Sequence, residues 1–138
     1  KVAGKKLNNN DSETNSTLDM LKKLSNVEFV GFINRNEIFD FLSEAYCLVN
    51  TSHYEGFSNT FLESISVETP VVTRISTDPD KIIMKNGLGI SVSDYSEIPK
   101  AINQIINKKY SFNGFKEYLL KYHDPKNLSK KLIDIVVR

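Results

Sequence analysis

Short apolar runs alternate along the chain with longer stretches in which apolar residues recur every three or four positions. The short runs are rich in β-branched and aromatic residues and are apolar on both faces, which is typical of strands covered by helices on two sides. They predict strands at residues 1–3, 27–30, 47–50, 71–74 and 89–92. We expect 27–30, 47–50 and 71–74 to be adjacent, buried parallel strands.

The longer stretches carry apolar stripes at helical spacing. They predict amphipathic helices around residues 18–24, 38–45, 60–67 and 96–106, and a terminal helix over 124–138.

Two further segments stand out by composition. Residues 7–15 are rich in Asn, Asp and Ser and are predicted to form an exposed loop. Aromatic residues at spacings of three, three and four mark a helix face that packs in the core or against another domain. They are Phe112, Phe115, Tyr118 and Tyr122.

The alternation of strands and helices predicts an α/β fold with a doubly wound parallel sheet. A chain of 138 residues is close to the size of one domain of about 150 residues. Ligands of such sheets bind beyond the carboxyl ends of the strands. The loops after Val30, Asn50 and Arg74 are therefore the places where chemistry is expected.

Composition narrows the classes of function. Lys and Arg number 18 against 17 Asp and Glu, so the net charge of +1 gives no field that would attract nucleic acid. The single cysteine, Cys47, cannot form an internal disulfide. No apolar run approaches the roughly 20 residues of a membrane span, and the polar start lacks a signal-peptide core. A cytoplasmic location is expected.

The loop after Asn50 carries the residues best suited to a binding site. Gly56 leaves the backbone open to a ligand, and the helix that follows presents free N–H groups that attract a phosphate. Glu55 and Glu63 flank this anion site, eight positions apart. Such a pair suits the acid and base of glycoside hydrolysis. Beside a phosphate, however, the two carboxylates better suit hydrogen bonds from sugar hydroxyls, as in a nucleotide-sugar pocket.

Other interpretations of the same residues stay open. Thr60-x-x-Glu63 also fits a capping box, in which Glu63 only folds back onto the Thr60 amide, and Glu55 also fits a plain surface residue. Asp78-Pro79-Asp80 has the spacing of a metal-binding Asp-x-Asp motif, but Asp-Pro marks a turn and Asp80 could cap a short helix. We expect no metal.

Four ordered blocks give this chain a likeness to a known family. EGFSNTFLE resembles the signature of the retaining family 4 glycosyltransferases of the GT-B fold, and VEFVGF, ETPVV and KNGLGISV resemble its surroundings. The likeness spans residues 1–106. It implies that residues 1–138 are a single incomplete nucleotide-sugar-binding domain, the Rossmann-like carboxy-terminal half of a GT-B fold.

The resemblance also implies roles for individual residues. Glu63 would hold the donor ribose, and Glu55 would be the catalytic residue, with an orienting and electrostatic role on the transferred sugar. The loop amides would meet the sugar hydroxyls, the helix start would meet the diphosphate, and the upstream turn would lie against the base. The loop residues are Gly56, Phe57 and Ser58, and the helix start is Asn59 and Thr60. The turn against the base is Phe32 and Ile33.

The family implies an enzyme that moves a hexose from a nucleotide sugar to a carbohydrate or lipid-linked acceptor, as in polysaccharide biosynthesis. The nucleotide sugar is the substrate, and no cofactor is expected. The full-length protein would contact the inner membrane face only peripherally. The alternative is a non-catalytic Rossmann-like nucleotide-binding or regulatory module.

The chain departs from the family pattern in two places. Glu68 stands where the family has a small residue or glycine, which suits a left-handed helix cap better. The chain also begins at what resembles the second strand of the family's domain, so we expect an amino-terminally truncated fragment with an exposed strand edge. Without the acceptor domain and the basic residues beside the diphosphate, this fragment is expected not to transfer sugar by itself.

Overall fold

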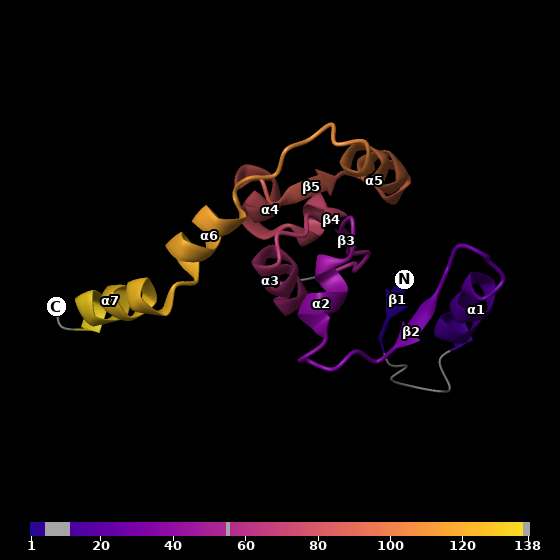
Figure 1. Ribbon diagram of the computed structural model, residues 1–138, viewed down its shortest axis with the longest axis horizontal. Helices are drawn as coiled ribbons and strands as arrows, with labels where there is room; N and C mark the ends of the chain where they lie inside the picture. Colours follow the sequence, from indigo (N-terminus) through magenta and orange to yellow (C-terminus); the bar gives the residue numbers. More distant parts are fainter. Residues whose placement is uncertain (5–11, 55, 137–138) are drawn as a thin grey trace. The chain divides into compact units, whose positions relative to one another are not determined.

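The computed structural model describes residues 1–4, 12–54 and 56–136. Within it the chain divides into two compact units, Lys1–Ile38 and Phe39–Arg138, whose elements are labelled in Figure 1. The single incomplete domain expected over 1–138 stays a prediction.

The unit Lys1–Ile38 is built from two strands and one helix. β1 (Val2–Ala3) pairs in parallel with β2 (Phe29–Gly31), and α1 (Ser12–Leu21) connects them. The Val2 amide donates to the Glu28 carbonyl at 2.7 Å, and the Gly4 amide donates to the Gly31 carbonyl at 2.8 Å.

Two predictions for this unit are wrong. The segment 27–30 does not form a buried strand: β2 covers Phe29–Gly31 and pairs with β1, and Phe29 is 38% exposed. A unit of this size has too little apolar surface to bury a strand on both faces. The loop predicted at 7–15 is helical from Ser12 onward, and residues 7–11 lie outside the described residues.

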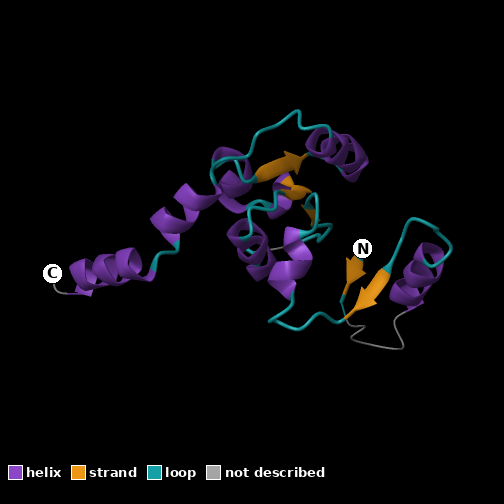
Figure 2. Ribbon diagram, in the orientation of Figure 1, coloured by secondary structure: helices purple, strands orange, loops and turns teal. Residues whose placement is uncertain are grey.

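The second unit, Phe39–Arg138, contains a three-stranded parallel sheet in the order β3–β4–β5, drawn as orange arrows in Figure 2. β3 covers Leu48–Val49, β4 covers Val71–Arg74 and β5 covers Gly89–Val92. Leu48 lies opposite Val71, and Val71 lies opposite Gly89. The predicted strands at 71–74 and 89–92, and their parallel neighbour within 47–50, are confirmed. β3 is an edge strand whose ladder among the described residues is with β4 alone.

Helices precede, connect and follow these strands. The α-helices are α2 (Ile38–Ser43), α3 (Asn59–Ser66), α4 (Ile82–Lys85), α5 (Ile98–Ile106), α6 (Phe115–Tyr122) and α7 (Pro125–Val136). Of these, α3 joins β3 to β4, and α4 lies between β4 and β5. Short 3-10 turns are η1 (Ile75–Thr77), η2 (Pro79–Lys81) and η3 (Tyr95–Glu97). The terminal helix expected within 124–138 is α7.

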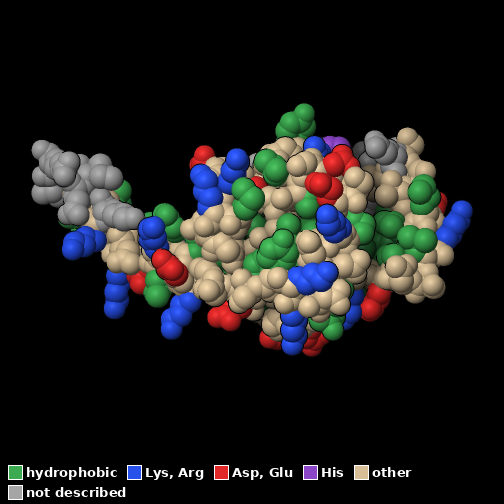
Figure 3. Space-filling model, turned by 90° about the horizontal axis from the view of Figure 1, so that it is seen from above, with side chains coloured by type: hydrophobic (Ala, Val, Ile, Leu, Met, Phe, Trp, Pro, Cys, Tyr) green, Lys and Arg blue, Asp and Glu red, His purple; other side chains and the backbone are tan. Residues whose placement is uncertain are grey.

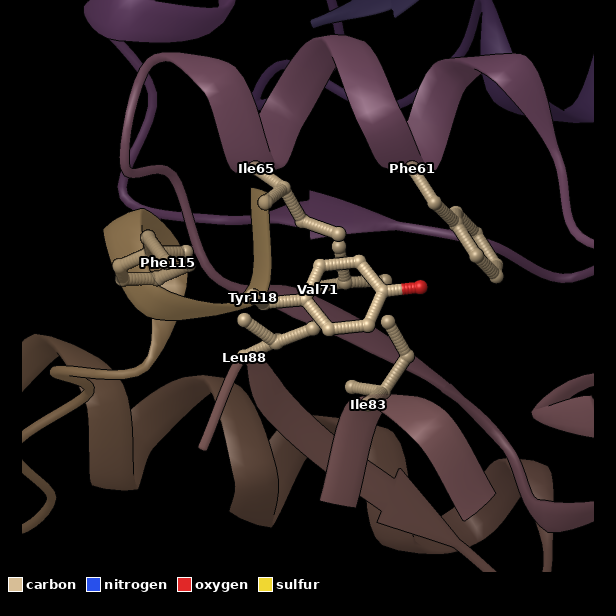
Figure 4. Close-up of a cluster of buried hydrophobic side chains, with 7 residues drawn as sticks. All are labelled: Phe61, Ile65, Val71, Ile83, Leu88, Phe115 and Tyr118. Atoms are coloured by element: carbon tan, nitrogen blue, oxygen red, sulfur yellow. The ribbon is translucent and has the colours of Figure 1, made fainter. Parts of the chain in front are cut away.

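The core has two parts because neighbouring residues of β4 point to opposite faces of the sheet. Val71 packs in the cluster shown in Figure 4, which α3, α4 and α6 cover. Its members are Phe61, Ile65, Val71, Ile83, Leu88, Phe115 and Tyr118. Val72 packs in a second cluster, mostly against α5, with Val92, Ile98, Ala101 and Ile105. A parallel sheet covered on both faces confirms the α/β, Rossmann-like class.

The end of α3 adopts the left-handed cap despite Glu68. Glu68 has φ of 60°, its amide donates to the Ile65 carbonyl at 3.1 Å, and the Thr69 amide donates to the Ser64 carbonyl at 2.9 Å. This is a Schellman motif with a glutamate in the position that favours glycine. The Ser64 hydroxyl donates to the Thr69 carbonyl, and the Thr69 hydroxyl donates to the Leu42 carbonyl, both at 2.8 Å. These two hydrogen bonds hold the turn in place.

Candidate functional site

The loop after β3 leads into an uncapped helix start. Ser58 is the N-cap residue of α3, with extended backbone angles of φ −66° and ψ 137°, and its side chain makes no capping hydrogen bond. The Phe61 amide donates to the Ser58 carbonyl at 3.0 Å. The amides of Asn59 and Thr60 have no acceptor within the helix. The start of α3 can therefore bind an anion.

The structure contradicts the capping-box interpretation of Thr60 and Glu63. A capping box needs Thr60 as the N-cap, but Thr60 is the second residue of α3. Glu63 lies four residues after Asn59, so the two share one helix face. It is half-buried, and no residue in the described part of the chain forms a hydrogen bond or ion pair with its carboxylate. Its oxygens are free to accept hydrogen bonds.

Phe57 fixes the loop onto the core. Its ring packs edge-on against Phe61 with 5.9 Å between centroids, and it stacks on the His123 ring at 6.2 Å and 17°. It also contacts Tyr118 at 6.2 Å. Because the side chain packs inward, any ligand contact of Phe57 is made by its backbone. Next to it, Gly56 is exposed, with no atom within 4 Å of the place where a Cβ would stand.

The other predicted site residues lie outside the described part of this loop. Glu55 lies outside the described residues. Phe32, which is 69% exposed, and the half-buried Ile33 belong to the unit Lys1–Ile38. The described part of the predicted site is thus the run from Gly56 to Glu63.

Asp78 has a structural role. It is buried, and its carboxylate accepts hydrogen bonds from the amides of Ile83 at 2.9 Å and Met84 at 3.4 Å, and from the Ser91 hydroxyl. It therefore caps α4, the role that sequence suggested for Asp80, which is exposed with φ of 55°. Among the described residues no group of three or more His, Cys, Asp or Glu side chains could hold a metal ion. That no metal is needed stays a prediction.

Sequence reasoning missed a group of polar contacts at the carboxyl ends of the strands. The Tyr95 hydroxyl donates to the Thr51 carbonyl at 2.9 Å, and the Arg74 guanidinium lies over the Tyr95 ring at 4.6 Å. The Thr73 and Thr77 hydroxyls are 2.8 Å apart. The loops after Asn50 and Arg74 were identifiable from strand order, but contacts between residues far apart in sequence were not.

A concavity of about 280 Å³ lies elsewhere, between the turn at Asn86 and Gly87 and the helix α6. It is lined by none of the predicted site residues. The turn precedes β5, so this hollow lies at the amino end of that strand. Ligands of parallel sheets bind at the opposite edge, and we place the site there.

His123, which stacks on Phe57, should make the stability of the protein sensitive to acid. Burial lowers the pKa of the His123 imidazole from its usual 6.5. The unfolded chain then binds this proton more readily than the folded chain does. The contribution of the neutral His123 to the free energy of unfolding is therefore complete above about pH 6.5 and is lost as the pH falls toward the folded-state pKa. We expect the urea midpoint to drop less between pH 7.5 and pH 5 in His123→Gln than in the wild type. Equal slopes in His123→Gln and in the wild type would contradict the prediction.

The face shown in Figure 3 carries both positive and negative side chains, with Lys and Arg interspersed among Asp and Glu. Within the described residues no helix has the length and apolar character that crossing a membrane requires.

The family model described as glycosyl transferases group 1 matches residues 2–108. No solved structure matches the chain.

Proposed function

The chain belongs to the glycosyl transferases group 1 family, and from this membership we propose that it binds a nucleotide-sugar donor for transfer of a hexose. The transfer would retain the anomeric configuration, and the acceptor would be a carbohydrate or a lipid-linked molecule. The donor is a substrate, so the reaction as proposed needs neither a cofactor nor a metal.

The observation that carries the proposal is the start of α3. The Asn59 and Thr60 amides lack intrahelical acceptors, and the half-buried Glu63 carboxylate lies one turn further along the same helix. This combination suits the diphosphate and the ribose of one nucleotide: N–H groups for the anion and a carboxylate for the hydroxyl donors. The ring contacts of Phe57 hold the preceding loop before the ligand arrives.

The remaining assignments rest on the family likeness. Gly56, Phe57 and Ser58 would meet sugar hydroxyls through backbone amides, while Phe32 and Ile33 would lie against the base. Glu55 would orient the transferred sugar and stabilise charge in the transition state, with no covalent role.

A non-catalytic nucleotide-binding module is the second candidate. It would use the same helix start and Glu63, but it would have no use for Glu55. Assays of sugar transfer by the full-length protein, with labelled nucleotide sugars and a lipid-linked acceptor extract, separate the two. Transfer that is lost in Glu55→Ala while nucleotide affinity stays unchanged supports the enzyme.

Replacement of Glu63 tests the binding site. In Glu63→Gln, the affinity for the preferred nucleoside diphosphate is expected to fall by about 1–3 kcal/mol, since a hydrogen bond to a charged group is lost. Isothermal titration with a panel of nucleoside diphosphates measures the change. The matched control is Glu44→Gln, which removes the same charge at an exposed position and should leave the affinity unchanged. An unaltered affinity in Glu63→Gln would remove this residue from the site.

A further inference from the structure

Arg74 ends β4 at the edge of the sheet where ligands bind. It lies two residues after Val72, so the two side chains share one face of the strand. Val72 packs in the second core cluster, and Tyr95 packs against the same cluster. Arg74 and Tyr95 therefore meet on the α5 face of the sheet, at its carboxyl end.

Tyr95 holds the arginine in a defined orientation. The guanidinium carbon of Arg74 is 4.6 Å from the centroid of the Tyr95 ring. The same ring receives the His53 ring edge-on at 6.0 Å, and its hydroxyl donates to the Thr51 carbonyl at 2.9 Å. Tyr95 thus ties Arg74 to the loop that continues to Gly56 and the start of α3.

The Nε–H group of Arg74 is fully buried and lacks a hydrogen-bond acceptor among the described residues. The nearby carboxylate of Asp94 does not supply one: it accepts from the Ser96 amide at 2.9 Å as part of a capping box. Hydrogen bonds from Ser96 chiefly lower the pKa of Asp94, and the Arg74 charge adds a smaller effect. A buried donor without a partner is rare in folded proteins and calls for an acceptor.

We propose that Arg74 binds an oxyanion of the substrate, a phosphate or a carboxylate, at the carboxyl end of β4. A guanidinium is always charged, and its planar donors match two oxygens of such a group at once. The contact with the Tyr95 ring restricts the guanidinium, so less side-chain freedom is lost on binding. The link through Thr51 places this contact beside the loop of the proposed donor site, and the inference rests on the proposed function to that extent.

Titration of the full chain with small oxyanions tests the proposal. The probes are inorganic pyrophosphate, which represents a donor diphosphate, and glucuronate, which represents the carboxylate of an acidic sugar. In Arg74→Gln the affinity for one of them is expected to fall at least about tenfold, the scale of a charge-assisted hydrogen bond. Lys109→Gln, which removes an exposed positive charge just beyond α5, should change it less than about twofold.

The probe that responds identifies the source of the oxyanion, and either response supports the proposal. If circular dichroism shows that Arg74→Gln does not fold, the same titrations are made with Arg74→Lys. This variant keeps the positive charge but loses the planar guanidinium. Arg74→Lys is expected to weaken binding severalfold. The proposal is overturned if the Arg74 variants bind both probes as tightly as the wild type or Lys109→Gln does. Arg74 would then be a solvated arginine that binds no oxyanion.

The test separates this inference from the proposed function, because pyrophosphate has no ribose for Glu63 to hold. Pyrophosphate binding through Arg74 in a chain that binds no nucleoside diphosphate would support the inference and contradict the proposed function. Nucleoside diphosphate binding that depends on Glu63, with no dependence of either probe on Arg74, would do the reverse.

Discussion

Replacing Phe61 by alanine is expected to lower the free energy of unfolding by about 3–5 kcal/mol. Phe61 is completely buried at the centre of the first core cluster, where α3 packs on β4. The truncated side chain would leave a cavity that the neighbouring strands and helices cannot fill. It would also remove the edge-on contact that holds Phe57. Urea unfolding followed by circular dichroism at 222 nm measures the loss.

Phe39→Ala is the matched control for this experiment. Phe39 lies on α2 and is 40% exposed, so the same truncation there should cost much less. Equal losses in the two variants would mean that Phe61 does not occupy the centre of the core.

Gly89→Ala is expected to destabilise the sheet by about 3 kcal/mol, at the upper end of the range for overpacking. Gly89 begins β5 opposite Val71 of β4, and a Cβ on it would stand 1.9 Å from the Val71 carbonyl oxygen. The clash is with backbone, so a rotamer change cannot relieve it. The two strands would have to separate along the β4–β5 ladder, which lowers the thermal unfolding midpoint.

Gly56→Ala provides the opposite case. A Cβ there meets no atom within 4 Å, so the melting temperature should stay close to that of the wild type. A Gly56→Ala variant as unstable as Gly89→Ala would contradict the packing described for β4 and β5.

Sequence alone could predict the parts of the fold whose residues are buried on both sides. The strands at 71–74 and 89–92 coincide with β4 and β5, because short runs rich in β-branched residues favour the covered strands of a parallel sheet; Val71 to Thr73 are buried in β4, and Val92 is buried in β5. The helix predicted at 60–67 is α3, displaced by one residue. The backbone at position 68 could not be predicted: Glu68 argued against a left-handed helix cap, yet it adopts one with φ of 60°.

Features that depend on distant partners could not be predicted in this way. The apolarity of 27–30 suggested burial, but apolar residues say nothing about which strand becomes the partner, and that partner is β1. The start of α3 at Asn59 rather than Thr60 follows from the extended backbone of Ser58. The contact of Arg74 with the Tyr95 ring joins the end of β4 to η3, and no local pattern signals it.

Within the unit Phe39–Arg138, β3 is an edge strand of the sheet, and its outer edge has a consequence for handling this unit. An edge strand offers unpaired backbone groups on which another chain can add a strand. Val49, at the end of β3, is 38% exposed, and the edge bears neither the lysine nor the proline that commonly blocks such additions. With only Leu48 and Val49 in the strand, each added ladder is short and weak. Self-association should therefore be weak, reversible and dependent on concentration, so calorimetry is best carried out on dilute samples.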